Sequence, residues 1–143
     1  MMSAHIVFEA LDPSWPATLS PVVIPTLLRE QMGFDGVLFS DDLEMRAIAD
    51  HQSPQTIAKR GLAATIDVFL VCHEVARAVS IRDAITYVTR QDEVAERHMR
   101  DALNRVTTLR RDAPDHASRP FTGVALKVEG QALSAQITTT PAG

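Results

Sequence analysis

The stretch GFDGVLFSDDLEM, which runs from Gly33 to Met45, decides the fold class of this chain. Its centre, Val37–Phe39, is a short apolar run without polar alternation, which is typical of a strand buried on both faces. Gly33 is the residue type that ends helices, because glycine adopts the left-handed conformation there without steric cost. The pair Asp41-Asp42 follows the run directly. The stretch therefore predicts a helix end, a buried parallel strand and a polar loop, in that order.

Similar elements flank this stretch on both sides. Further buried strands are predicted at Ile6–Phe8 and at Val68–Cys72, again from apolar runs rich in β-branched or aromatic residues. Helices are predicted between and after the strands, two of them with Ser-Pro start signals that combine an N-cap with proline in the first turn. These helices run from Ser20-Pro21 to Met32, from Ser53-Pro54 through Leu62, over Val75–Val88 and over Glu93–Leu109.

The order of these elements predicts an α/β fold in which strands recur about every 30 residues, the length of one βαβ unit. Such units build either an open doubly wound sheet or a (β/α)8 barrel of roughly 250 residues. Because three units in 143 residues are too few to close a barrel, we expect a small open domain or a barrel fragment. Residues 112–143, rich in Pro, Thr, Ala and Gly, are expected to form a loosely ordered tail with a weak strand at Val124–Val128.

The composition narrows the function classes. A formal net charge of -4 provides no basic face for sequence-independent nucleic-acid binding. No apolar stretch approaches the roughly 20 residues of a membrane helix. The chain has one cysteine, Cys72, and its first residues lack the basic and apolar regions of a signal peptide. We therefore expect a cytoplasmic protein with neither a nucleic acid nor a membrane among its partners.

Asp41 is the strongest candidate for a catalytic residue. In parallel α/β folds, functional residues collect just beyond the C-terminal ends of strands. An aspartate in that position can attack an anomeric carbon and form a covalent glycosyl intermediate. The same residue types are also preferred N-caps, so Ser40, Asp41 or Asp42 can instead cap a short helix that runs through Ala47. The spacing alone leaves both interpretations open.

Two histidines raise a metal or acid–base interpretation. His5 lies at the first predicted strand, and His73 follows the third. No His/Cys spacing matches a zinc pattern, and the adjacent Cys72 and His73 would point to opposite sides of a strand, so we expect no metal site. The chain also lacks a GxGxxG motif, a P-loop and a GxSxG elbow. Nucleotide binding and serine hydrolase chemistry are therefore not indicated, and no cofactor is expected.

Beyond Gly33–Met45, further stretches carry a recognisable pattern, at Met2–Phe8, Asp12–Ser20, Leu28–Glu30, Val71–His73 and Asp101–Val106. Together they resemble the bacterial β-N-acetylhexosaminidases of glycoside hydrolase family 3, over about residues 1–111. The resemblance implies the C-terminal portion of a (β/α)8 TIM-type barrel, about three βα units, with Asp101–Val106 in the final barrel helix. It also implies a retaining, metal-independent glycosidase that releases N-acetylglucosamine from peptidoglycan turnover fragments in the cytoplasm.

The resemblance also assigns roles to residues. The family's nucleophile is the first aspartate of its Ser-Asp-Asp block, which corresponds to Asp41 here. An ionised carboxylate in that position both attacks the sugar and stabilises its oxocarbenium-like transition state. His5 and Met45 are expected to bind the substrate.

The sequence departs from the family at several places. The family's general acid/base is a histidine in an upstream loop of the Lys-His-Phe-Pro-Gly-His-Gly type, which this sequence does not contain. His5 does not replace it, because nothing in the sequence places His5 beside the glycosidic oxygen. The family has glycine where this chain has Thr65, and a β-branched residue is disfavoured wherever φ is positive. Gly61, inside a predicted helix, costs roughly 0.5–1 kcal/mol relative to alanine.

Two function classes follow from these observations. The first is a β-N-acetylhexosaminidase that acts on an N-acetylglucosamine-containing saccharide through Asp41 and is incomplete without an N-terminal barrel segment. The second is a non-catalytic truncated remnant that serves as a weak sugar-binding or interaction module. Because unpaired sheet edges invite association, the expected protein partner is the missing barrel segment or a second copy of the chain.

Overall fold

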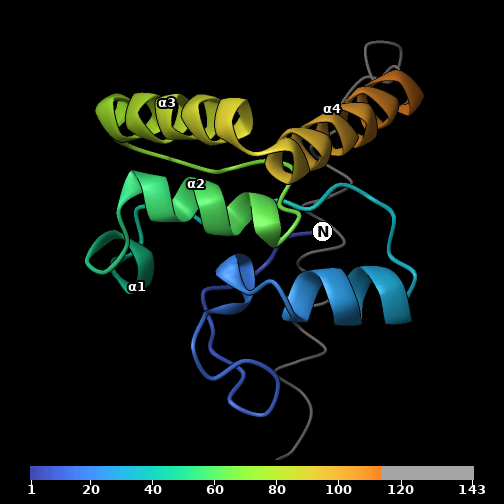
Figure 1. Cartoon of the computed structure of the whole chain (residues 1–143), viewed down its shortest axis with the longest axis horizontal. Coiled ribbons are helices and arrows are strands. Elements are labelled where there is room, and N and C mark those ends of the chain that lie inside the picture. The colour runs from blue at the N-terminus through green and yellow to red at the C-terminus, as the bar shows by residue number, and fades with distance from the viewer. Residues whose placement is uncertain (114–143) are drawn as a thin grey trace, which may run out of the picture. The chain divides into compact units, whose positions relative to one another are not determined.

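The computed structural model describes residues 1–113, of which Met1–Asp112 form one compact unit (Figure 1). Its elements are the 3₁₀-helix η1 (Ala17–Leu19), the π-helix η2 (Val23–Gln31) and the α-helices α1 (Arg46–Ala49), α2 (Pro54–Ala63), α3 (Val75–Gln91) and α4 (Glu93–Asp112). None of the helices within residues 1–113 has the length and apolar character needed to span a membrane. Residues 114–143, which make up nearly all of the predicted tail, lie outside the described residues. The strand expected at Val124–Val128 therefore lies outside them as well.

Helices are present in all four predicted regions, the first of them as the π-helix η2. The Ser53 hydroxyl accepts a hydrogen bond from the Thr56 N–H at 3.1 Å and caps α2. The Ser20 hydroxyl accepts the N–H groups two and three residues further on, at 3.2 and 3.1 Å. The helix itself begins later, with Val22 as its N-cap and no side-chain cap, so the predicted start at Ser20-Pro21 is wrong. Gly33, with φ of 69°, follows the last turn of η2 in the left-handed conformation.

The three predicted strands are reduced to isolated bridges in the described part of the chain. Two parallel bridges join Met2 to Phe39 and Phe39 to Val68. The central segment therefore lies between the other two, in the order typical of consecutive βαβ units. The direction of pairing agrees with the prediction, whereas the expected strand lengths are wrong.

The first predicted strand is also misplaced. The bridge uses Met2, whereas Ile6, Val7 and Phe8 are 55%, 45% and 43% exposed. The carbonyl groups of Ile6 and Phe8 accept hydrogen bonds from the loop at residues 11–17 instead of from the central segment. An apolar run in the sequence does not show whether the segment pairs with another strand or bonds to a nearby loop. That depends on the neighbour that the folded chain places beside it.

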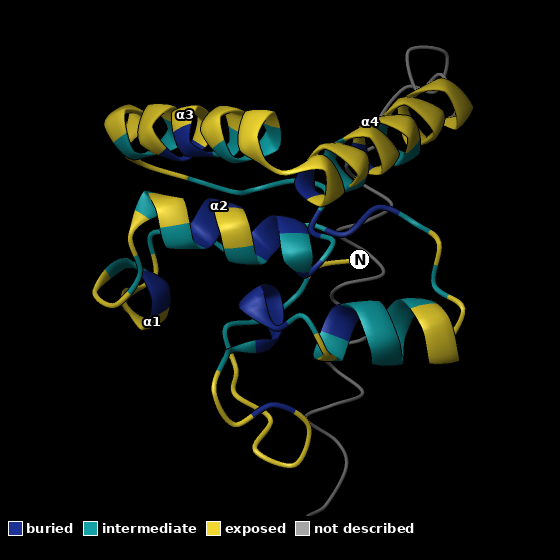
Figure 2. Ribbon diagram, viewed as in Figure 1, coloured by how far each residue is buried: buried dark blue, intermediate teal, exposed yellow. Residues whose placement is uncertain are grey.

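The core consists of two apolar clusters that both contact the partly buried Phe69. Helices α2 and α3 lie side by side, and α2 is buried along the side that faces the rest of the unit, whereas α3 and α4 expose most of their outer surface (Figure 2). The first cluster contains Leu19, Leu43, Ile48, Ile57 and Ile81, and the second contains Ile24, Leu38, Ala64 and Ile66.

The structure gives the surroundings of two residues that the sequence marked as unfavourable, Thr65 and Gly61. Thr65 has φ of 57°, so the concern about a β-branched residue at this position is confirmed. The Thr65 hydroxyl nevertheless makes a contact that glycine lacks, since its Oγ1 accepts a hydrogen bond from Arg29 Nε at 2.8 Å. Gly61 is required by packing, since a methyl group at this position would overlap the Phe69 ring. The close approach of α2 to Phe69 thus explains a residue that helix propensity disfavours.

Candidate active site

The loop after the central bridged segment is anchored by two fully buried residues. The Ser40 hydroxyl accepts a hydrogen bond from the Leu70 N–H at 2.8 Å. Leu43 packs in the first core cluster, and its N–H donates to the Leu70 carbonyl at 2.9 Å. Asp41 and Asp42 lie between these anchors. Their backbone is therefore held at the C-terminal end of the parallel segments, where functional residues of such folds collect.

Asp41 and Asp42 make different contacts within this loop. Asp41 Oδ1 accepts the Asp42 N–H at 2.8 Å, and Asp42 Oδ1 accepts the Glu44 N–H at 3.1 Å. Neither aspartate caps α1, whose N-cap is Met45 without a side-chain hydrogen bond. The helix-cap interpretation is therefore wrong for this helix. Asp42 instead closes a local turn, and the nucleophile interpretation of Asp41 stays as a prediction.

His5 connects the first bridged segment to this loop. Its Nε2 donates to the Asp42 carbonyl at 3.0 Å, and in the neutral ring Nδ1 accepts from the Thr18 hydroxyl at 3.0 Å. Both ring nitrogens thus bond to groups of the protein itself, one to the backbone of Asp42 and the other to the Thr18 hydroxyl. Direct contact of His5 with a sugar stays a prediction, as does that of Met45, which is exposed beside the loop.

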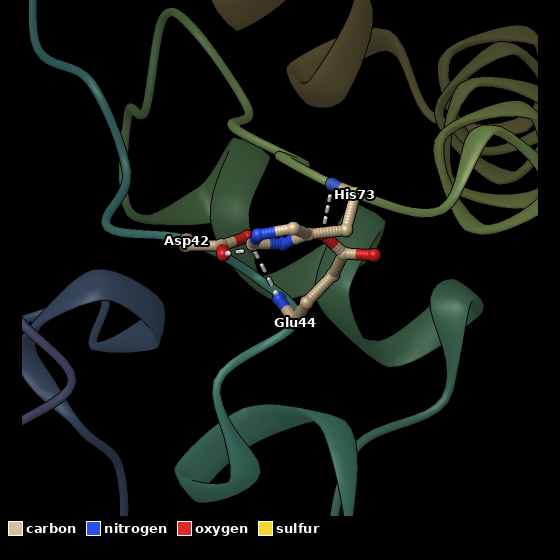
Figure 3. A group of neighbouring side chains, drawn as sticks. All are labelled: Asp42, Glu44 and His73. Atoms are coloured by element: carbon tan, nitrogen blue, oxygen red, sulfur yellow. Dashed lines mark hydrogen bonds and ion pairs between the residues drawn. The ribbon is translucent and has the colours of Figure 1, made fainter.

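Glu44 is a site residue that the sequence analysis missed. Its carboxylate accepts the N–H groups of Cys72, His73 and Glu74 at 2.8, 2.5 and 2.6 Å, and His73 Nδ1 lies 3.1 Å from its Oε2. Figure 3 shows the His73 imidazole between the carboxylates of Asp42 and Glu44. Glu44 therefore ties the loop after the central segment to the loop after the third. No local pattern reveals this contact, because its partners lie 28–30 residues away along the chain.

The environment of Glu44 keeps it ionised. Partial burial disfavours the charged form, but the backbone N–H bonds from residues 72–74 and the bond from His73 outweigh it and hold the pKa of Glu44 below its usual value. A carboxylate whose pKa is lower in the folded state stabilises the fold at pH values above its unfolded pKa. That contribution disappears as the pH falls through the lower, folded value.

We expect Glu44→Gln to unfold at a lower temperature than the wild type at pH 7. The difference should shrink as the pH falls from 7 to well below 4.5, the ordinary pKa of glutamate, because Glu44 of the wild type then becomes protonated as well. Thermal unfolding followed by circular dichroism across this range measures the effect. Glu30→Gln, at an exposed position, serves as the matched control and should show no such trend. A melting difference for Glu44→Gln that does not change with pH would contradict the role of the carboxylate charge.

Cys72 adjoins the same loop but is not suited to act as a nucleophile. Partial desolvation and the negative charges of Asp42, Glu44 and Asp41 raise the pKa of the Cys72 thiol. The thiolate is the reactive form of cysteine, so the raised pKa makes this exposed thiol less reactive than an ordinary cysteine.

Comparison with known proteins identifies the family. The model of the glycosyl hydrolase family 3 N terminal domain matches residues 1–109. A β-hexosaminidase of Shewanella frigidimarina is 43% identical over 74 residues, which cover 52% of this chain and 21% of that protein. A β-hexosaminidase of Chromobacterium violaceum is 38% identical over 97 residues, covering 68% of this chain and 27% of that protein.

Solved structures agree with this relationship. A family 3 β-N-acetylglucosaminidase from Paenibacillus superposes with a TM-score of 0.73 at 34% identity, over 77% of this chain and 21% of that chain. The β-N-acetylglucosaminidase from Thermotoga maritima gives a TM-score of 0.69 at 28% identity, over 75% of this chain and 24% of that chain. The matching domains of these enzymes are TIM-barrel-like.

The fold is that of a glycoside hydrolase domain. The chain belongs to glycosyl hydrolase family 3, as its resemblance predicted. It spans about a quarter of the length of the curated relatives that it matches.

Proposed function

We propose that this chain supplies the nucleophile of a retaining β-N-acetylhexosaminidase. The observation that carries the proposal is the position of Asp41, on a loop held at both ends by the buried Ser40 and Leu43. A fixed backbone limits the freedom of the carboxylate, and positioning of reacting groups lowers the barrier of a displacement reaction. Membership of family 3 and the names of the relatives favour terminal N-acetylglucosamine as the sugar that is released.

The proposed reaction has two displacement steps. The Asp41 carboxylate attacks the anomeric carbon, the glycosidic bond breaks, and a general acid protonates the departing oxygen. Water then attacks the glycosyl–Asp41 ester while the same group, now a base, takes a proton from the water. The sugar leaves with its original configuration, and Asp41 is a free carboxylate again. The chain supplies the nucleophile, and the proton-transferring histidine belongs to the upstream loop that the family resemblance implies.

We also propose that residues 1–111 are the last three βα units of a (β/α)8 barrel. The parallel bridges follow the chain order of such units, and the paired stretches are short. The exposed apolar residues Ile6, Val7 and Phe8 offer a surface that a further barrel segment can cover. The proposed partner is therefore the N-terminal barrel segment, which brings the acid/base loop with it. The substrates are peptidoglycan turnover fragments, and the location is the cytoplasm.

A chimera tests the proposed function. Residues 1–109 of this chain replace the matching segment of the Shewanella frigidimarina β-hexosaminidase. We expect the chimera to hydrolyse an aryl N-acetyl-β-glucosaminide, and the chain alone to show no turnover, because it has a nucleophile without its proton donor.

The controls separate folding from chemistry. Circular dichroism establishes that the chimera is folded, and the unmodified Shewanella enzyme sets the reference rate. A folded chimera without turnover would contradict the enzymatic proposal and favour the non-catalytic remnant, whose sugar binding nuclear magnetic resonance would detect. Turnover by the chain alone would contradict the need for the upstream segment.

A further inference from the structure

Three side chains beside Asp41 have the donor types and spacing of a metal site. One carboxylate oxygen each from Asp42 and Glu44, together with a ring nitrogen of His73, lie within 4.8 Å of one another (Figure 3). His73 Nδ1 is 3.1 Å from Glu44 Oε2 and 3.7 Å from Asp42 Oδ2. Ligands bound to zinc at about 2.0–2.2 Å in a tetrahedral arrangement lie about 3.4 Å apart. The two measured separations bracket this value.

The surrounding structure holds these donors in place. Asp42 and Glu44 belong to one turn, closed by the bond from the Glu44 N–H to Asp42 Oδ1. The Glu44 carboxylate in turn fixes the backbone of His73. Such bonds to ligating groups orient them and are part of most metal sites in proteins. The side chains of Asp42 and Glu44 are only 20% and 12% exposed, whereas His73 is 78% exposed, so an ion can enter from the solvent past the imidazole.

We propose that Asp42, Glu44 and His73 together bind one divalent transition-metal ion of the Zn²⁺ and Co²⁺ class. The ion takes the place of the proton on His73 Nδ1, which otherwise bonds to Glu44 Oε2. One imidazole and two carboxylates are ligands that suit these ions, and water completes the coordination. The site adjoins the loop of Asp41 but does not include that residue, so it goes beyond the proposed glycosidase function. It is the alternative to the expectation of no metal site, which rested on His/Cys spacing and on the opposite directions expected for Cys72 and His73.

Titration of the full chain with Co²⁺ tests the proposal. We expect one ion per chain by calorimetry, with visible absorption bands of low-coordinate cobalt. His73→Gln should weaken the binding at least about tenfold, because loss of even an outer-shell partner costs about 10–100-fold in affinity. His51→Gln, which removes an exposed histidine outside the cluster, should leave the affinity unchanged.

Asp42→Asn provides a second test that does not involve a histidine, and it should also weaken Co²⁺ binding at least about tenfold. Circular dichroism of each variant establishes that it is folded. Three results would overturn the proposal: no binding to the wild type up to millimolar Co²⁺, equal affinity of the wild type and both variants, or loss of binding in Cys72→Ser alone. The last result would assign the ion to the thiol.

Discussion

Asp41→Asn in the Shewanella chimera is expected to lower the turnover of an aryl N-acetyl-β-glucosaminide by on the order of 10³-fold or more, as for the loss of other enzyme nucleophiles. The asparagine amide has nearly the same shape as the carboxylate, so the loop anchored by Ser40 and Leu43 should keep its structure. It has no negative charge, however, and neither attacks the anomeric carbon nor stabilises the oxocarbenium-like transition state. Initial rates at saturating substrate measure the loss.

Asp42→Asn in the same chimera is the matched control, because it makes the same chemical change one residue away. Asp42 closes a turn and faces His73 at 3.7 Å, so its replacement should reduce the rate less than that of Asp41. Mass spectrometry of the active chimera during turnover should detect a glycosyl group on the peptide that contains Asp41. Equal losses in the two variants, or a glycosyl group on another peptide, would contradict the assignment of the nucleophile.

Asp67→Asn is expected to destabilise the chain by about 3–5 kcal/mol, the typical cost of removing one partner of a buried ion pair. The Asp67 side chain is 0% exposed and accepts hydrogen bonds from Arg29 Nη2 at 2.9 Å and from the Leu38 N–H at 2.7 Å. Arg105 donates to its other oxygen from Nε and Nη2, at 2.9 and 2.8 Å. Asparagine removes the carboxylate charge that both guanidinium groups contact. Because whole domains are stable by only about 5–15 kcal/mol, the effect is large.

Urea unfolding of the full chain, followed by circular dichroism, measures this loss. Asp83→Asn is the control, since Asp83 pairs with Arg82 at the surface and such pairs contribute about 0–1 kcal/mol. Arg105→Gln should cost less than Asp67→Asn, because Arg29 still neutralises the carboxylate in that variant. A free energy of unfolding for Asp67→Asn within about 1 kcal/mol of the wild-type value would contradict this prediction. It would show that the ion pairs of Asp67 with Arg29 and Arg105 contribute little to stability.

The helices were predictable from the sequence because their signals are local, and a local stretch is also what makes Asp41 the candidate nucleophile. Ser53 caps a helix with a residue three positions on, and Gly33 adopts a conformation that its own lack of a side chain permits. Asp41 lies in a contiguous stretch whose pattern resembles family 3. The family model over residues 1–109 agrees with that resemblance, and the role of Asp41 within it is the subject of the chimera experiment.

The strand lengths and the supporting contacts of the site depend on partners far along the chain. Ile6–Phe8 reads as a strand by composition, but Met2 is the residue that pairs with Phe39. Glu44 accepts hydrogen bonds from the backbone of residues 72–74, and Asp67 forms ion pairs with two arginines from different helices. The sequence alone thus determined the helices, the family and the candidate nucleophile. The tertiary structure decided which segments pair and which side chains hold the loop, because those contacts exist only once distant residues are brought together.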